Sequence, residues 1–125
     1  MYLDIHAHFA EEGYDIPAAW ERIVAAGVKK VVLAGDTAAH SRMHRDLADR
    51  YEGLYFAAGV HPSEAERLPA DALEEIGALC AHPKCVALGE IGLDYHWDTP
   101  GRRAQQALFS AQLELADRLA LPVQI

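Results

Sequence analysis

The segment Lys30-Val-Val-Leu-Ala-Gly35 decides the fold, because it is an apolar run of strand length that stops at a glycine. A helix is expected before it, beginning at Asp15 with Pro17 in its first turn and ending at Gly27. A second helix is expected after it, over residues 37–51. A strand that is apolar throughout is typical of a parallel sheet that is covered on both faces.

The same order of short apolar runs and longer helical patterns extends along the whole chain. Further strands are expected over residues 2–5, 54–60, 86–88 and 121–125, and further helices over residues 69–81 and 99–119. The chain thus alternates strand and helix four times and then begins a fifth strand. This alternation predicts an α/β fold with a parallel sheet and helices outside it.

Composition and charge limit the functions that the chain can have. Its 125 residues fit one domain, 51% of them are hydrophobic, and the formal net charge is −8. This charge argues against a protein that holds nucleic acid mainly through a basic surface. It does not exclude a nuclease, because bound metal cations can supply the local positive charge.

The expected location is the cytoplasm. The first residues carry no basic and apolar signal region, and no apolar run approaches the roughly 20 residues of a membrane span, so no membrane contact is expected. Cys80 and Cys85 lack the spacing of a Cys-x-x-Cys motif. We therefore expect two reduced thiols and neither a disulfide nor a zinc site there.

Polar side chains gather where the expected strands end. His6 and His8 close the first strand, His61 follows the third, and Glu90 follows the fourth. The carboxyl ends of parallel strands are where barrels and open α/β sheets place their active sites. This concentration at one end of the sheet is the strongest evidence for a site that the residues alone provide.

His6, His8 and Glu90 are the candidate metal ligands. Side chains two apart in a strand point to the same face, so the two imidazoles can bind one divalent ion through neutral nitrogens. Glu90, flanked by Gly89 and Gly92, can bind one ion or bridge two through its carboxylate oxygens. The alternatives are a structural pair of hydrogen-bonded histidines and a glutamate that pairs with an arginine or caps a helix.

Three further positions near the strand ends have both a functional and a structural interpretation. His61, in the turn Gly-Val-His-Pro, can orient an anionic substrate or hold its own turn. Asp94 and Tyr95 can support the metal ligands or fix their loop. The following residues 96–98 (His-Trp-Asp) lie on the same side and can contact substrate.

The remaining histidines are weaker candidates. His40 and His44 have the helical spacing of a metal site, but their polar neighbours predict a solvated helix face. His82 precedes a proline and is expected to mark the end of a helix. The sequence contains no Gly-rich phosphate loop and no Gly-x-Ser-x-Gly motif, which leaves nucleoside-triphosphate chemistry and serine hydrolysis without support.

Four segments, in this order, resemble the TatD family of metal-dependent hydrolases, which are related to amidohydrolases and many of which are described as deoxyribonucleases. The segments are Leu-Asp-Ile-His-Ala-His (3–8), Ala-Gly-Val-His-Pro (58–62), Gly-Glu-Ile-Gly-Leu-Asp-Tyr (89–95) and Leu-Ala-Leu-Pro-Val (119–123). The resemblance covers essentially the whole chain, including residues 109–116.

The resemblance implies a (β/α)₈ TIM-type barrel with a centre of two divalent ions, of Zn, Mg or Mn. His6 and His8 would hold the first ion, Glu90 would bridge the two, and His61 would lie near the substrate, which makes Glu90 and His61 the catalytic candidates. Paired ions ~3.5–4 Å apart activate a water and stabilise the oxygens of an ester. The implied reaction is hydrolysis of ester bonds, above all the phosphodiesters of DNA, so nucleic acid or another phosphoester is the expected partner.

A barrel of this type takes roughly 250 residues, whereas residues 1–125 hold its first four β/α units and its fifth strand. We therefore expect the N-terminal half of one hydrolase barrel domain. The family's remaining ligands, two histidines and an aspartate at later strand ends, lie outside this segment. Because lone parallel strands at both edges would expose unpaired backbone, the chain is expected to be an incomplete record of a longer protein.

Two other functions stay open at this point. Amidohydrolases and phosphoesterases of the polymerase–histidinol-phosphatase type also carry His-x-His on their first strand. A truncated, non-catalytic relative that keeps the fold to bind a partner is the alternative outside the enzymes.

Overall fold

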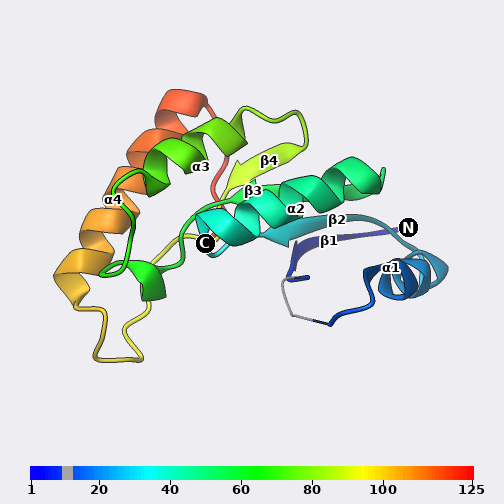
Figure 1. Ribbon diagram of the computed structural model, residues 1–125, viewed down its shortest axis with the longest axis horizontal. Coiled ribbons are helices and arrows are strands. Elements are labelled where there is room, and N and C mark those ends of the chain that lie inside the picture. The colour runs from blue at the N-terminus through cyan, green and yellow to red at the C-terminus, as the bar shows by residue number, and fades with distance from the viewer. Residues whose placement is uncertain (10–12) are drawn as a thin grey trace.

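The computed structural model describes residues 1–9 and 13–125, in which parallel strands alternate with helices (Figure 1). The strands are β1 (Tyr2–Ala7), β2 (Val28–Ala34), β3 (Leu54–Ala58) and β4 (Cys85–Leu88). The helices are α1 (Ile16–Ala25), α2 (Ala38–Arg50), α3 (Ala72–Cys80) and α4 (Arg102–Leu119), with a short 3-10 helix η1 at Pro62–Glu64. This order confirms the predicted alternation of strand and helix.

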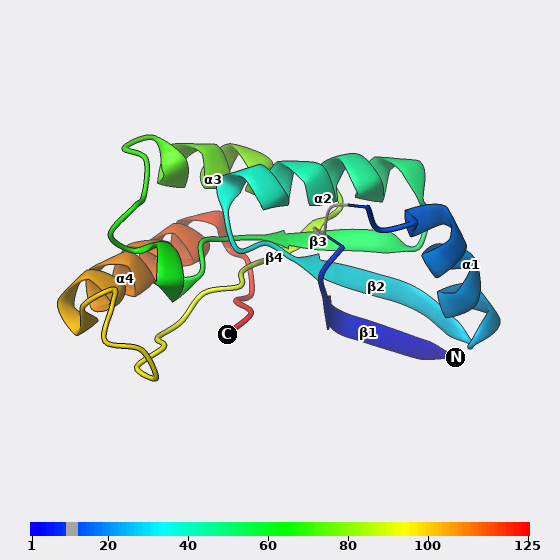
Figure 2. The same ribbon diagram turned by 60° about the horizontal axis from the view of Figure 1, so that its bottom comes forward.

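The four strands form one sheet in the order β1-β2-β3-β4, and every neighbouring pair is parallel. Each crossover therefore leads to the adjacent strand, and all four strands end at the same edge. Figure 2 shows α2 and α3 lying side by side along one face of this sheet. The common edge is where the chain can bring together side chains that are distant in sequence.

The main core lies between the sheet and its helices. Its largest fully buried apolar side chains include Leu33, Leu54, Phe56, Ile76 and Leu88. A smaller cluster contains Val32, Ala57 and Ala87. Because neighbouring residues of a strand point to opposite faces, Val32 and Leu33 belong to different sides of the sheet.

Side-chain caps fix where the first two helices begin. The Asp15 carboxylate accepts a hydrogen bond from the Ala18 amide (3.1 Å), and the Thr37 hydroxyl accepts one from the His40 amide (3.1 Å). The fourth helix begins at Arg102, later than the expected start at residue 99. The reason is Gln105, whose amide nitrogen donates to the Pro100 carbonyl (2.8 Å) and holds that residue outside the helix.

The third helix also begins later than expected, at Ala72 and not at residue 69, with Asp71 at its N-cap. The expected strand over residues 121–125 is a single parallel bridge between Leu88 and Val123. The Gln124 amide donates to the Leu88 carbonyl (3.0 Å), and the Leu88 amide donates to the Pro122 carbonyl (2.9 Å). Pro122 has no amide hydrogen of its own, which shortens the ladder that this segment can form.

Cys80 and Cys85 are buried free cysteines at the end of α3 and the start of β4. His82 follows two residues after the last residue of α3, close to the expected end of that helix. None of the helices in the described part of the chain is long and apolar enough to span a bilayer.

His44 contradicts the prediction of a solvated polar face on the second helix. Its side chain is fully buried (0% exposed), and neither ring nitrogen has a hydrogen-bond partner among the described residues. The pKa of His44 is lowered to about 4, mainly by burial and also by the nearby His40 and His8. The prediction was wrong because Ser41 and Leu47, three residues away on either side, share the buried face of α2.

His44 should make the protein acid-sensitive. Between pH 6.5 and about 4 the unfolded chain protonates this histidine and the folded chain does not, so the free energy of unfolding falls as the pH falls. A difference of this size is worth about 3 kcal/mol in total. We predict that His44→Leu flattens this part of the pH profile, measured by urea denaturation at pH 7 and pH 4.5. The exposed His96→Leu is the control, and equal pH slopes for wild type and His44→Leu would contradict the prediction.

Candidate metal centre

Three side chains from the ends of β1 and β4, the two outer strands, meet at the carboxyl edge of the sheet. The Nε2 atoms of His6 and His8 are 3.1 Å apart. Glu90 Oε2 lies 3.3 Å from His6 Nε2 and 3.7 Å from His8 Nε2. One ligand atom from each residue can therefore contact the same ion, since these atoms all lie within 4.8 Å of one another.

The spacing of these three atoms fits a cation. Ligands about 2.0–2.1 Å from a tetrahedral ion lie roughly 3.4 Å from each other, and the separations between 3.1 and 3.7 Å lie around this value. A carboxylate accepts only, and each neutral imidazole has one nitrogen with a free lone pair, so these groups can donate lone pairs to a cation. The side chains of His6 and His8 are 38% and 45% exposed, so an ion can reach them from solvent.

A close approach of two glycines carries Glu90 from β4 toward β1. The Gly89 amide donates to the Ala58 carbonyl on β3 (2.9 Å), and the Glu90 amide donates to the Gly35 carbonyl just after β2 (2.6 Å). A Cβ atom on Gly59 would lie 2.6 Å from the carbonyl carbon of Gly89. The missing side chain of Gly59 therefore allows the segment after β4 to pass the end of β3 and place the Glu90 carboxylate beside the histidines.

His61 has a defined donor atom at the same edge. Its Nδ1 accepts a hydrogen bond from the Ser63 amide (3.1 Å), so the proton of the neutral ring is on Nε2. This Nε2 lies 3.9 Å from Glu90 Oε1, the oxygen other than the one that faces His6 and His8. His61 thus holds its own turn, and its Nε2 faces the candidate centre, whereas its action on a substrate stays a prediction.

Gln112 on α4, which is not among the residues predicted for the site, fixes the residue before His61. Its side-chain oxygen accepts from the Val60 amide (2.8 Å), and its nitrogen donates to the Val60 carbonyl (2.9 Å). The side chain is fully buried. A glutamine between Leu108 and Leu115 on an apolar helix face was the available signal, because a buried amide needs partners.

Asp36 and His40 form a second acid–histidine pair next to the centre. Asp36 Oδ1 lies 2.5 Å from His40 Nδ1, and the Asp36 carbonyl accepts from the His61 amide (2.8 Å). Burial acts to raise the pKa of Asp36, but its hydrogen bond to His40 and the charge of His40 outweigh this and leave the pKa below its ordinary value. The pair lies at the end of β2, between the ends of β1 and β3.

Asp94 and Tyr95 fix the segment that follows Glu90. Asp94 Oδ1 accepts from the His96 amide (3.0 Å), and the Tyr95 hydroxyl accepts from the Gln106 side chain (3.0 Å). These contacts favour the loop-fixing interpretation of both residues over support of the metal ligands.

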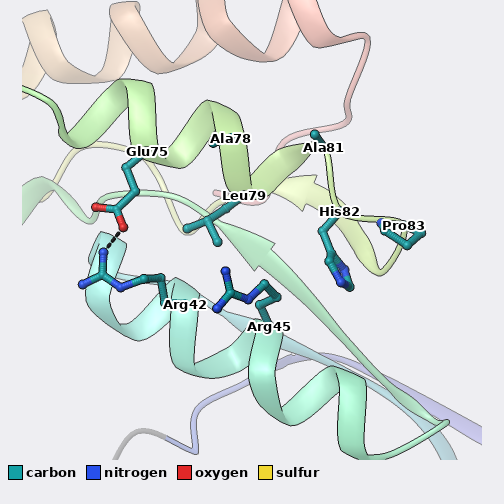
Figure 3. Close-up of a pocket in the computed structure, with 8 residues that line it drawn as sticks. All are labelled: Arg42, Arg45, Glu75, Ala78, Leu79, Ala81, His82 and Pro83. Atoms are coloured by element: carbon teal, nitrogen blue, oxygen red, sulfur yellow. Dashed lines mark ion pairs between the residues drawn. The ribbon is translucent and has the colours of Figure 1, made fainter.

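A groove between α2 and α3, with a volume of about 480 Å³, lies apart from these residues (Figure 3). Its charged side chains are already paired: Arg42 with Glu75, Arg45 with Asp46 and His82 with Asp49. It is lined by Arg42, Arg45, Glu75, Ala78, Leu79, Ala81, His82 and Pro83, none of which belongs to the candidate metal centre. The groove therefore contains none of the candidate metal ligands.

A parallel α/β chain that brings two histidines and a glutamate to the carboxyl edge of its sheet has the architecture of barrel-type metal hydrolases. The family model described as TatD related DNase matches residues 3–125. The chain belongs to this family, which confirms the resemblance seen in its motifs.

Relatives with known sequences or structures support the same assignment. The uncharacterized metal-dependent hydrolase YabD of Bacillus subtilis is 36% identical over 127 residues, and the 3'-5' ssDNA/RNA exonuclease TatD of Citrobacter rodentium is 40% identical over 102 residues. They match 100% and 82% of this chain, and 50% and 39% of their own lengths.

Solved structures confirm the fold class. The crystal structure of YjjV, a TatD homologue from Escherichia coli, superposes with a TM-score of 0.91 at 36% identity and covers 98% of this chain. A TatD-family hydrolase from Entamoeba histolytica superposes with a TM-score of 0.88 at 23% identity. The chain spans 49% and 48% of these two proteins, so its four β/α units correspond to about half of each.

The close contact between Gly59 and Gly89, which we call the glycine crossing, should not accommodate a side chain on Gly59. We predict that Gly59→Ala lowers the free energy of unfolding by about 1–3 kcal/mol, because its Cβ would overlap the Gly89 backbone. Gly77→Ala is the matched control: its Cβ would make an ordinary contact with Leu115 (3.6 Å), and alanine in a helix should add roughly 0.5–1 kcal/mol. Urea denaturation measures both, and equal stability of Gly59→Ala and wild type would contradict the crossing.

Proposed function

We propose that this chain is the metal-binding first half of a hydrolase barrel domain that cleaves ester bonds, with phosphodiesters of DNA as substrate. The observation that carries the proposal is the group of His6, His8 and Glu90, whose ligand atoms lie within 4.8 Å of one another. The relatives support it, since several are named metal-dependent hydrolases and others 3'-5' ssDNA/RNA exonucleases. Their greater length supports the assignment of residues 1–125 to one half of the domain.

His6, His8 and the Oε2 atom of Glu90 would hold one divalent ion, and Oε1 of Glu90 is available to a second. Such ions supply Lewis acidity, which offsets the negative charge of a phosphodiester and favours attack by water. Imidazole and carboxylate ligands suit Zn, Mn and, less readily, Mg. The described residues provide one group of three ligands, so we propose that the ligands of a second ion come mainly from outside residues 1–125.

His61 would act on the substrate. Because its Nδ1 is engaged by the Ser63 amide, Nε2 carries the proton and can donate to a phosphoryl oxygen bound beside Glu90. Gln112 holds Val60 by two hydrogen bonds and so fixes the backbone from which this donor projects. Cations at the centre would offset the negative charge of the chain and attract an anionic substrate there.

Metal binding should depend on the three ligands. We predict that His6→Ala and Glu90→Gln each weaken the binding of Zn²⁺ or Mn²⁺ at least tenfold, measured by isothermal titration calorimetry, because each removes one ligand of a small set. His82→Ala is the matched control, since His82 pairs with Asp49 in the groove between α2 and α3.

Hydrolysis of single-stranded DNA, assayed with added metal in an intact protein that contains both halves of the barrel, should be lost in the same two variants and retained in His82→Ala. Unchanged metal affinity or unchanged hydrolysis in either variant would refute the proposed centre. A folded chain that binds none of the three metals would instead favour a non-catalytic, partner-binding relative.

A further inference from the structure

The segment between Glu90 and α4 exposes apolar side chains that the metal centre does not use. Leu93, Tyr95 and Trp97 are 43%, 38% and 65% exposed. Single exposed apolar residues are ordinary on protein surfaces, but here three lie at alternate positions within five residues. We call residues 93–98 the aromatic loop.

The aromatic loop is held in place by polar side chains. Gln105, which is buried, accepts from the Asp94 amide and donates to the Asp94 carbonyl, both at 2.8 Å. The Gly101 amide at the far end of the segment donates to Glu66 (2.8 Å). A loop that is fixed by buried bonds and still exposes a tryptophan is already ordered for binding, so little conformational entropy is lost when a ligand arrives.

Cationic and aromatic groups lie together on this loop. The Arg102 guanidinium lies 4.5 Å from the centre of the Tyr95 ring, and His96 contacts Trp97 edge to face, with ring centres 4.6 Å apart. Arg102 and its neighbour Arg103 are exposed in the first turn of α4. Flat aromatic faces beside arginines are the combination that binds the bases and phosphates of single-stranded nucleic acid without sequence preference.

The loop continues directly from the candidate metal centre. In Figures 1 and 2 the yellow segment leads from the end of β4, where Glu90 lies, to the start of α4. Trp97 is seven positions after Glu90 in the sequence, which limits their distance to about 25 Å even for an extended chain. A short oligonucleotide with one phosphodiester at the centre can therefore reach the loop.

We propose that the aromatic loop is a base-stacking platform for single-stranded nucleic acid, with Trp97 as its main contact. The proposal rests on the proposed function for the choice of ligand, but its chemistry is independent of the metal ligands. Stacking on Trp97 compensates for the scarcity of positive charge, because it binds bases and not phosphates.

The test uses the fluorescence of Trp97 as its reporter. The chain contains two tryptophans, and in Trp20→Phe the signal comes from Trp97 alone. This variant, titrated with a ten-residue oligothymidylate in the presence of EDTA, should show saturable quenching. Trp97→Ala should weaken binding of the same labelled oligonucleotide by about 5- to 100-fold in fluorescence anisotropy, and Trp97→Phe should restore most of it. Trp20→Phe is also the matched control for the anisotropy measurement, because Trp20 packs against Tyr51 away from the aromatic loop, and it should keep the wild-type affinity.

Two results would overturn the platform: equal oligonucleotide affinity of Trp97→Ala and wild type, or quenching that depends on protein concentration and not on oligonucleotide. The second result would indicate that the loop contacts another copy of the chain. Failure of the proposed function is distinguishable, because it appears as metal binding that His6→Ala does not change, whereas the EDTA titration needs no metal. The same titration on His82→Ala, in the groove between α2 and α3, should give the wild-type affinity for the oligonucleotide.

Discussion

The close approach of Gly59 and Gly89 is the constraint on which the rest of the structure depends. A parallel sheet places β1 and β4 at opposite sides, and their side chains meet only if the chain after β4 crosses the end of β3. The crossing needs bare backbone, since a Cβ on Gly59 would lie within 2.6 Å of Gly89. The hydrogen bond from the Glu90 amide to the Gly35 carbonyl then fixes the carboxylate beside His6 and His8.

Helix α4 supplies the polar contacts that support both proposed functions. Gln112 holds Val60 and thereby the backbone of His61, while Gln105, two turns earlier, holds Asp94 and thereby the aromatic loop. Each buried amide satisfies a main-chain amide and carbonyl that helix and sheet leave free. A rigid helix thus positions two irregular segments at the carboxyl edge, one beside the metal ligands and one at the proposed base-binding surface.

Local patterns in the sequence were enough to predict the alternation of strands and helices and the residues that meet at the sheet edge. The His-x-His spacing and the strand-end positions of His61 and Glu90 are visible in a linear sequence, because parallel strands share one end. Tertiary features were not predictable in this way. The burial of His44 depends on how α2 packs against the rest of the chain. The contact of Gly59 with Gly89 joins residues 30 positions apart. The hydrogen bonds of Gln112 to Val60 join residues 52 positions apart.

The central claim is that His6, His8 and Glu90 bind one cation together, and X-ray absorption spectroscopy of the chain loaded with one equivalent of Zn²⁺ tests it most directly. The account predicts a shell of nitrogen and oxygen ligands at about 2.0–2.1 Å with the outer scattering of two imidazoles. Scattering from sulfur at about 2.3 Å, which would place the ion at Cys80 and Cys85, or a shell without imidazole, would contradict it.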